Sequence, residues 1–263
     1  IAVQNTSGAD ATAYVTYRDA TGTAITAANE SAVISAYSTK IFYQNDNTNL
    51  PAGFSGSAVI TSTVPLAVVV NNANAGTSVG TAGFESYNGF ASSQGATKIF
   101  LPKLTVNFSD YQSSFTIQNA GTVAANMTIT YTFGTNTWTK TSPLIQPGAA
   151  WSVYLATSSA SGIPAGTSGP GSAVVTSSQP MVALVTEVKS TLGYSVISVG
   201  VADGQSTDTV LFPKFDRNFS GYNGGIQIQN IGTAPTRMQA TFSGGNLATD
   251  LTPGTPSREA SEQ

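Results

Sequence analysis

The sequence of 263 residues contains no cysteine and no histidine. Without cysteine the chain has no disulfide, no thiolate metal ligand and no cysteine nucleophile, and its redox compartment stays undetermined. Without histidine, zinc and haem sites lack their usual imidazole ligand, and a serine hydrolase lacks its usual base. These absences exclude several large classes of enzyme and metalloprotein. We therefore expect no catalytic residues, no metal site and no cofactor.

Charged residues are scarce, at 9% of the chain, against about 25% in an average soluble protein. Ten Lys and Arg face 13 Asp and Glu, for a net charge of −3. No basic stripe is available to neutralise phosphates, so nucleic acid is not an expected partner. A surface solvated by hydroxyl and amide groups instead favours an extracellular or cell-surface location.

Long hydrophobic runs are also missing. The longest, Leu-Ala-Val-Val-Val at 66–70, is far shorter than the roughly 20 residues of a membrane-spanning helix. We therefore expect no membrane span. Because residue 1 lies in the middle of a repeat, the lack of a signal peptide or anchor carries no information.

A repeated stretch organises the rest of the sequence. Pro-Lys-Leu-Thr-Val-Asn-Phe-Ser-Asp-Tyr at 102–111, followed by Phe-Thr-Ile-Gln-Asn at 115–119, returns 111 residues later at 213–222 and 226–230. The first residues, Ile-Ala-Val-Gln-Asn, match the end of this stretch, which predicts a further copy without its front half. Three other blocks also repeat: 50–53 matches 163–166, 57–62 matches 172–177, and 65–70 matches 180–185.

Short alternating apolar runs, separated by turn residues every ~8–12 positions, are typical of an all-β sandwich. The sequence predicts tandem immunoglobulin-like β-sandwich modules with a repeat of about 111 residues and no convincing helix. Residues 1–96 are expected to form a module lacking its first strand, and residues 97–207 a complete one. Residues 208–242 are expected to supply the leading strands of a third, partial repeat, and 243–263 an irregular tail.

A module without its first strand exposes unpaired backbone groups that invite another strand. We therefore predict that 210–230 of one subunit completes the N-terminal module of the next, giving a head-to-tail homo-oligomer. An alternative remains open, in which the chain is a piece of a longer array and each repeat folds alone. The predicted assembly residues are Val210, Phe212, Phe215, Phe219, Ile226 and Ile228, with Ile1 and Val3 as the acceptor.

Sites for other chemistry are weakly indicated. Acidic residues are few, and no carboxylate pair recurs between the copies, since Glu187 aligns with Asn72 and Glu85 has no counterpart; this disfavours a glycosidase and an enzyme in general. The oxygen-rich loops 45–49 and 203–208 lack the acidic spacing of a calcium loop, so solvated turns are favoured.

Lys103 and Lys214 occupy equivalent positions. One interpretation is an isopeptide bond to Asn119 or Asn230, but no buried acid is identifiable beside them, and a charge that protects a strand edge is favoured. Asn107 and Asn218 are equivalent heads of Asn-x-Ser triplets, which makes them candidate glycosylation sites.

The Leu/Phe-Pro-Lys, Asn-Phe-Ser-x-Tyr, Ile-Gln-Asn and Pro-Ala-Gly blocks resemble the immunoglobulin-like tandem repeats of secreted, surface-attached proteins in filamentous bacteria. The resemblance covers about residues 1–242 and implies a structural role in a surface fibre, sheath or adhesive stalk. The alternative is a carbohydrate-binding region of a larger secreted protein, in which aromatic residues stack on a polysaccharide. The candidate stacking residues are Tyr87, Phe90, Tyr111, Tyr194 and Tyr222.

Overall fold

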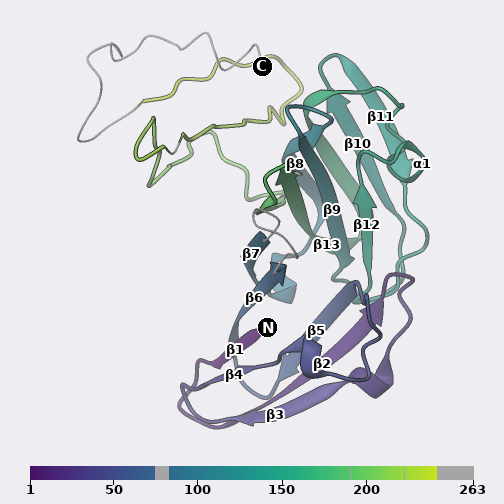
Figure 1. The fold of residues 1–263 in the computed structure, drawn as a ribbon, viewed down its shortest axis with the longest axis vertical. Helices are drawn as coiled ribbons and strands as arrows, with labels where there is room; N and C mark the ends of the chain where they lie inside the picture. Colours follow the sequence, from purple (N-terminus) through teal and green to yellow (C-terminus); the bar gives the residue numbers. More distant parts are fainter. Residues whose placement is uncertain (75–82, 190, 222, 242–263) are drawn as a thin grey trace. The chain divides into compact units, whose positions relative to one another are not determined.

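The structure, a computed structural model, describes residues 1–74, 83–189, 191–221 and 223–241. The chain divides into two compact units, Ile1–Thr207 and Asp208–Gln263. The first unit is built of antiparallel sheets (Figure 1), which confirms the predicted predominance of β-strands for this part of the chain. The predicted tail, 243–263, lies outside the described residues.

Strands β1 to β7 form the first half of this unit. They make two sheets, with the strand orders β4-β1-β6-β7 and β3-β2-β5. Three-residue 3-10 turns connect them at Thr26–Ala28 and Gln44–Asp46. The strands are β1 (Ala2–Asn5), β2 (Ala11–Asp19), β3 (Glu30–Ile34), β4 (Thr39–Ile41), β5 (Gly56–Ser62), β6 (Leu66–Asn74) and β7 (Gly83–Asn88).

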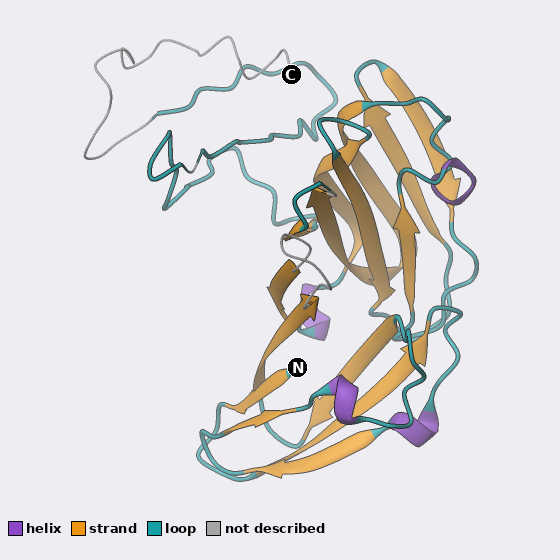
Figure 2. Cartoon of the chain, in the orientation of Figure 1, coloured by secondary structure: helices purple, strands orange, loops and turns teal. Residues whose placement is uncertain are grey.

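Strands β8 to β15 form the second half, around the 21-residue strand β13 (Gly169–Lys189). The first part of β13 pairs with β8 and β10, and its second part pairs with β9 and β14. The other elements, drawn in Figure 2, are a 3-10 turn at Ser92–Gln94, β8 (Ala96–Val106), β9 (Tyr111–Asn119), β10 (Met127–Phe133), β11 (Asn136–Thr141), β12 (Ala150–Tyr154), the short helix α1 (Ser158–Ser161), β14 (Tyr194–Val199) and β15 (Val201–Ala202). Within the described part of the chain, no helix is long and apolar enough to cross a membrane.

The two halves share a pairing pattern. β1 lies between β4 and β6, as β9 lies between β12 and the second part of β13. β2 lies between β3 and β5, as β10 lies between β11 and the first part of β13. β5 and β6 together therefore correspond to β13. Strand β8 is the exception, because no described strand of the first half occupies its place.

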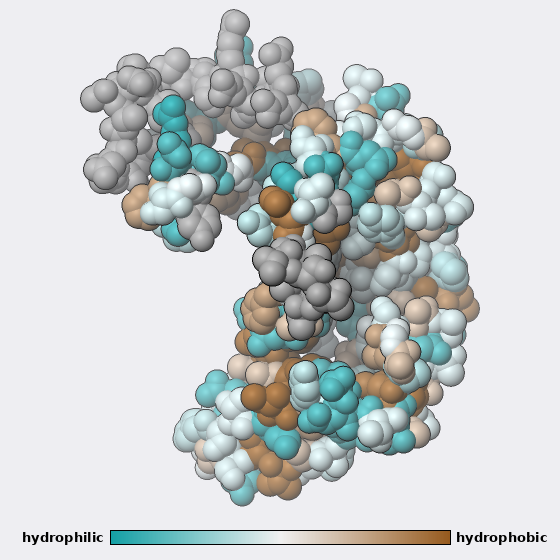
Figure 3. All heavy atoms as spheres, viewed as in Figure 1, coloured by the Kyte–Doolittle hydropathy of each residue, from teal (hydrophilic) through white to brown (hydrophobic). Residues whose placement is uncertain are grey.

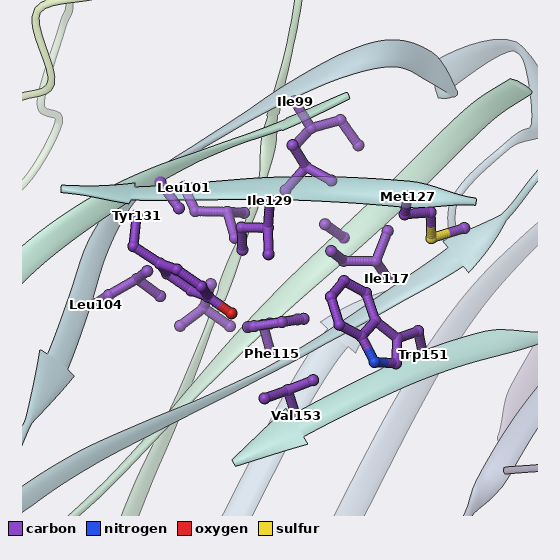
Figure 4. Packing of buried hydrophobic residues seen from close by; sticks show 14 of the residues in the cluster. Ile99, Leu101, Leu104, Phe115, Ile117, Met127, Ile129, Tyr131, Trp151 and Val153 are labelled. Carbon is purple, nitrogen blue, oxygen red and sulfur yellow. The ribbon is translucent and has the colours of Figure 1, made fainter. Parts of the chain in front are cut away.

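Apolar side chains of the second half converge on one core, shown in Figure 4. Trp151 packs edge-on against Phe115, with 5.2 Å between the ring centroids. The corresponding core of the first half contains Val3, Val15 and Tyr17. Its members on β5 and β6, such as Ile60, are only partly buried, whereas the equivalent Val175 is fully buried. Ile60 is less buried than Val175 because β8 covers this side of the second core, and no described strand covers it in the first half.

Two equivalent tyrosines differ in their hydrogen bonding. The Tyr17 hydroxyl donates to Glu30 Oε1 at 2.7 Å and accepts from Gln44 Nε2 at 3.2 Å. Burial, together with the hydrogen bond to Glu30, raises the pKa of Tyr17 to about 12. The Tyr131 hydroxyl is buried and has no hydrogen-bond partner among the described residues. Burial alone raises the pKa of Tyr131. The two hydroxyls therefore contribute differently to stability.

Replacing each tyrosine by phenylalanine tests this difference. Tyr17→Phe removes a paired hydroxyl and leaves Glu30 with one partner fewer, so we expect a loss of roughly 1–2 kcal/mol in the free energy of unfolding. Tyr131→Phe removes an unpaired polar atom and should change it by less than about 0.5 kcal/mol, or increase it. Urea unfolding of both variants measures the effect, and a larger loss for Tyr131→Phe would contradict the assignment.

Candidate functional site

Strand β8 completes the second half by pairing along the first part of β13. Its register places Ile99 opposite Val175, Phe100 opposite Val174 and Leu101 opposite Ala173. Ile99 and Leu101 are buried members of the core. The other edge of β8 pairs with β15. The leading strand of the repeat is therefore an interior strand that closes the sheet and the core together.

The corresponding edge is open on β5. The Tyr17 carbonyl accepts a hydrogen bond from the Ile25 amide and so faces away from β5. In an antiparallel pair, the backbone N–H and C=O groups of two opposed residues either point toward each other or both point away. Ala58 lies opposite Tyr17, so its N–H and C=O point to the outer edge of β5. Ile60 and Ser62 follow with the same orientation. Within the described chain, β5 pairs with β2 alone.

One group on this edge is already covered. Gln118 Nε2 donates to the Ala58 carbonyl at 3.3 Å and to the Gly148 carbonyl at 2.8 Å. Ser57 Oγ also donates to the Gly148 carbonyl, at 2.7 Å. The Gln118 side chain thus occupies the Ala58 end of the β5 edge. A strand that adds to β5 must replace this single long contact.

The predicted assembly residues lie in the second unit, where the described residues 208–241 form no strand. Phe212 is 52% exposed, and its neighbour Leu211, which was not among the predicted assembly residues, is 86% exposed. The other predicted assembly residues are also exposed, except for the half-buried Ile226: they are Val210, Phe215, Phe219 and Ile228.

Of the predicted acceptor residues, Val3 lies on β1 and Ile1 directly precedes this strand. This strand is paired on both sides, and Val3 is fully buried, while Ile1 is half-buried. Neither residue borders the open edge; Val3 instead belongs to the core beneath it. The edge itself belongs to β5, which sequence reasoning did not single out, because the sequence does not show which strands are neighbours in a sheet.

Local turns of the repeat are nevertheless preserved in the second unit. Asn119 Nδ2 donates to the Val123 carbonyl, and its Oδ1 accepts from the Gly121 amide. Asn230 makes the same two contacts with the residues four and two positions later. Asn107 and Asn218 both have positive φ, at 46° and 52°. The segment therefore holds the turns of a leading hairpin without its sheet. Both Asn107 and Asn218 are exposed, and their glycosylation stays a prediction.

Lys103, in the second half of β8, forms an ion pair with a buried acid. Its Nζ lies 2.6 Å from Glu187 Oε1, and Thr105 Oγ1 donates to Glu187 Oε2 at 2.5 Å. The sequence indicated no acid beside this lysine, because Glu187 lies 84 residues away. The equivalent Lys214, itself exposed, makes an ion pair with the partly buried Asp216, at 3.1 Å.

In the first half, Asn72 on β6 takes the position of Glu187. Asn72 lies opposite Glu85 on β7, and Ser195 Oγ of β14 donates a hydrogen bond to Glu85 Oε1. Burial, and then the nearby charge of Glu85, raise the pKa of Tyr87. Among the described residues, no group of three or more acidic side chains could hold a metal ion.

The aromatic residues considered for sugar stacking come from several elements. Tyr194 is exposed on β14, and Phe90 is half-buried. Tyr87 is partly buried, and Tyr111 lies under Lys189 Nζ, 4.8 Å from the ring centroid. Tyr222 lies outside the described residues. Lys189 of β13 lies opposite both Tyr111 of β9 and Tyr194 of β14, so these two tyrosines flank it on one face of the sheet.

No protein-family model matches the chain, and no curated protein matches it. Among solved structures, the chain is similar to that titled "Crystal Structure of Thermotoga maritima 1070", with 23% sequence identity and a TM-score of 0.35. The match covers 41% of this chain and 95% of that chain. A likeness at this TM-score carries no argument about function.

The two lysine ion pairs provide a matched test of burial. Lys103→Met leaves the buried Glu187 carboxylate with Thr105 as its remaining side-chain partner, and we expect a loss of about 1–2 kcal/mol in unfolding free energy. Lys214→Met removes the more exposed of the two pairs and should cost less than about 0.5 kcal/mol. Urea unfolding in dilute solution measures both, and equal costs would show that the Glu187 pair is not stabilising.

Proposed function

We propose that the chain is a non-enzymatic structural subunit made of tandem immunoglobulin-like β-sandwich repeats, and that residues 208–215 of one copy add to β5 of another. One observation carries the proposal: β8 covers on β13 the same edge that is open on β5. Residues 207–217 are the sequence counterpart of β8. The chain therefore contains both an open edge and a second copy of the strand that closes such an edge.

The register of β8 on β13 defines the expected pairing. Transferred to the first half, it places Val210 opposite Ile60, Leu211 opposite Val59, and Phe212 opposite Ala58. Val210 and Phe212 then take the core positions of Ile99 and Leu101. Burying each side chain stabilises by about 1.5–3 kcal/mol, and each ladder hydrogen bond by about 0.5–1.5 kcal/mol. Association costs about 4–15 kcal/mol, so assembly should depend on protein concentration.

Such an assembly is heterologous, because the donor segment and the acceptor edge are different surfaces. Contacts of this kind extend into open filaments unless the rotation between subunits closes a ring. The scarcity of charge and the lack of a cysteine or histidine site agree with a structural role outside the cell. Figure 3 shows hydrophobic and hydrophilic residues interspersed over the face it displays. We assign the chain to a surface fibre, sheath or stalk.

Cysteine cross-linking tests the register. The chain has no cysteine, so Val59→Cys and Leu211→Cys introduce single thiols at positions that the register makes opposite. Cα atoms of opposed antiparallel residues lie about 4.5–5.5 Å apart, within disulfide range. Mixing the two variants under mild oxidation should give a disulfide-linked heterodimer, identified by peptide mass.

Two controls make the cross-linking result decisive. Lys98→Cys with Thr176→Cys in one chain joins an opposed pair on β8 and β13 and should cross-link within the monomer. Leu192→Cys, at another exposed position, replaces Leu211→Cys in a second mixture. A Val59–Leu211 yield no higher than the Val59–Leu192 yield would overturn strand addition.

A further inference from the structure

The donated strand carries a lysine whose position in the completed module can be read from the second half. There, Lys103 of β8 reaches Glu187 with 2.6 Å between Nζ and Oε1. In the third copy the lysine is Lys214, and in the first half the acid is replaced by Asn72. If residues 208–215 add to β5 as β8 adds to β13, the Lys214 amine lies beside the Asn72 carboxamide. This inference rests on the proposed function.

An acid already stands next to Asn72. In the ladder of β6 and β7, Asn72 lies opposite Glu85, and Val70 lies opposite Tyr87. Alternation along a strand puts all four side chains on one face. Val70, Glu85 and Tyr87 are each partly buried. Asn72 itself is exposed at the end of this row, at the place that the incoming strand would cover.

We propose that Asn72 and Glu85 form the acceptor of an intermolecular amide bond with Lys214 of a second copy. The Glu85 carboxylate takes a proton from the Lys214 ammonium, and the free amine attacks Cγ of Asn72. A bond forms between Nζ and Cγ, and the bond from Cγ to Nδ2 breaks as Glu85 returns its proton to the leaving nitrogen. Nζ also loses a second proton, which the departing ammonia takes up, so the products are a secondary amide and an ammonium ion, and the net reaction needs no oxidant, reductant or cofactor.

Only the first half can form this amide bond, because it has Asn72 at the position where the second half has Glu187. A carboxamide can transfer its acyl group to an amine with loss of ammonia, whereas the ionised Glu187 carboxylate resists attack by an amine. Lys103 therefore stays in an ion pair within its own module. Among the described residues, Lys214 makes an ion pair with the partly buried Asp216, and its own side chain is 76% exposed. It is accessible to the module of another copy.

Mass spectrometry of the purified chain tests the bond. Wild-type protein incubated at high concentration should form dimers and longer species that survive boiling in detergent. Their digests should contain a peptide joining Lys214 to Asn72, lighter by one ammonia than the sum of its parts. Lys214→Arg and Asn72→Ala should abolish these species. Glu85→Gln should slow their formation by about 100-fold, the contribution expected of a proton-transfer group.

Matched controls separate this chemistry from assembly itself. Asn71→Ala changes the neighbouring amide, on the opposite face of β6, and Lys103→Arg changes the equivalent lysine of the other repeat. Both variants should keep the linked peptide. If Val59→Cys and Leu211→Cys cross-link but no linked peptide forms, the amide bond is overturned and strand addition stands. If neither product forms, both proposals are overturned.

Discussion

The backbone of an edge strand is the constraint on which the site depends, since each outward N–H and C=O needs a partner or water. In the second half, β8 meets this need for β13 and covers the core with Ile99 and Leu101. In the first half, β5 keeps its open edge, and the core beneath it is only partly covered. The Gln118 side chain, on the Ala58 carbonyl, covers one group of that edge.

Much of the fold could be predicted because its signals are local. Alternation of apolar residues marked the strands, and the repeated blocks showed that 57–62 and 172–177 are equivalent. What the sequence does not contain is the order of strands within a sheet. The acceptor was therefore predicted at the start of the chain, at Ile1 and Val3, whereas the open edge belongs to β5, more than 50 residues further along the chain.

The second unit keeps the turns of the repeat but not its strands, because turns depend on local contacts and strands on distant ones. The turn contacts of Asn230 and the positive φ of Asn218 involve residues only a few positions away, so they form without the rest of a module. A strand, in contrast, needs a partner ladder, and residues 208–241 form none within the described chain. The Lys103–Glu187 pair is equally non-local, because a bend of β13 brings the acid to the lysine. Sequence spacing alone gave no sign of it.

Light scattering of the whole chain over a range of concentrations tests strand addition most directly. The account predicts a mass that rises with concentration for the wild type and for Phe219→Asp, because the equivalent Phe108 stays exposed in the completed module. It predicts a constant monomer mass for Phe212→Asp, because the equivalent Leu101 is fully buried. A wild-type protein that stays monomeric at all concentrations, or a Phe212→Asp variant that assembles like the wild type, would contradict it.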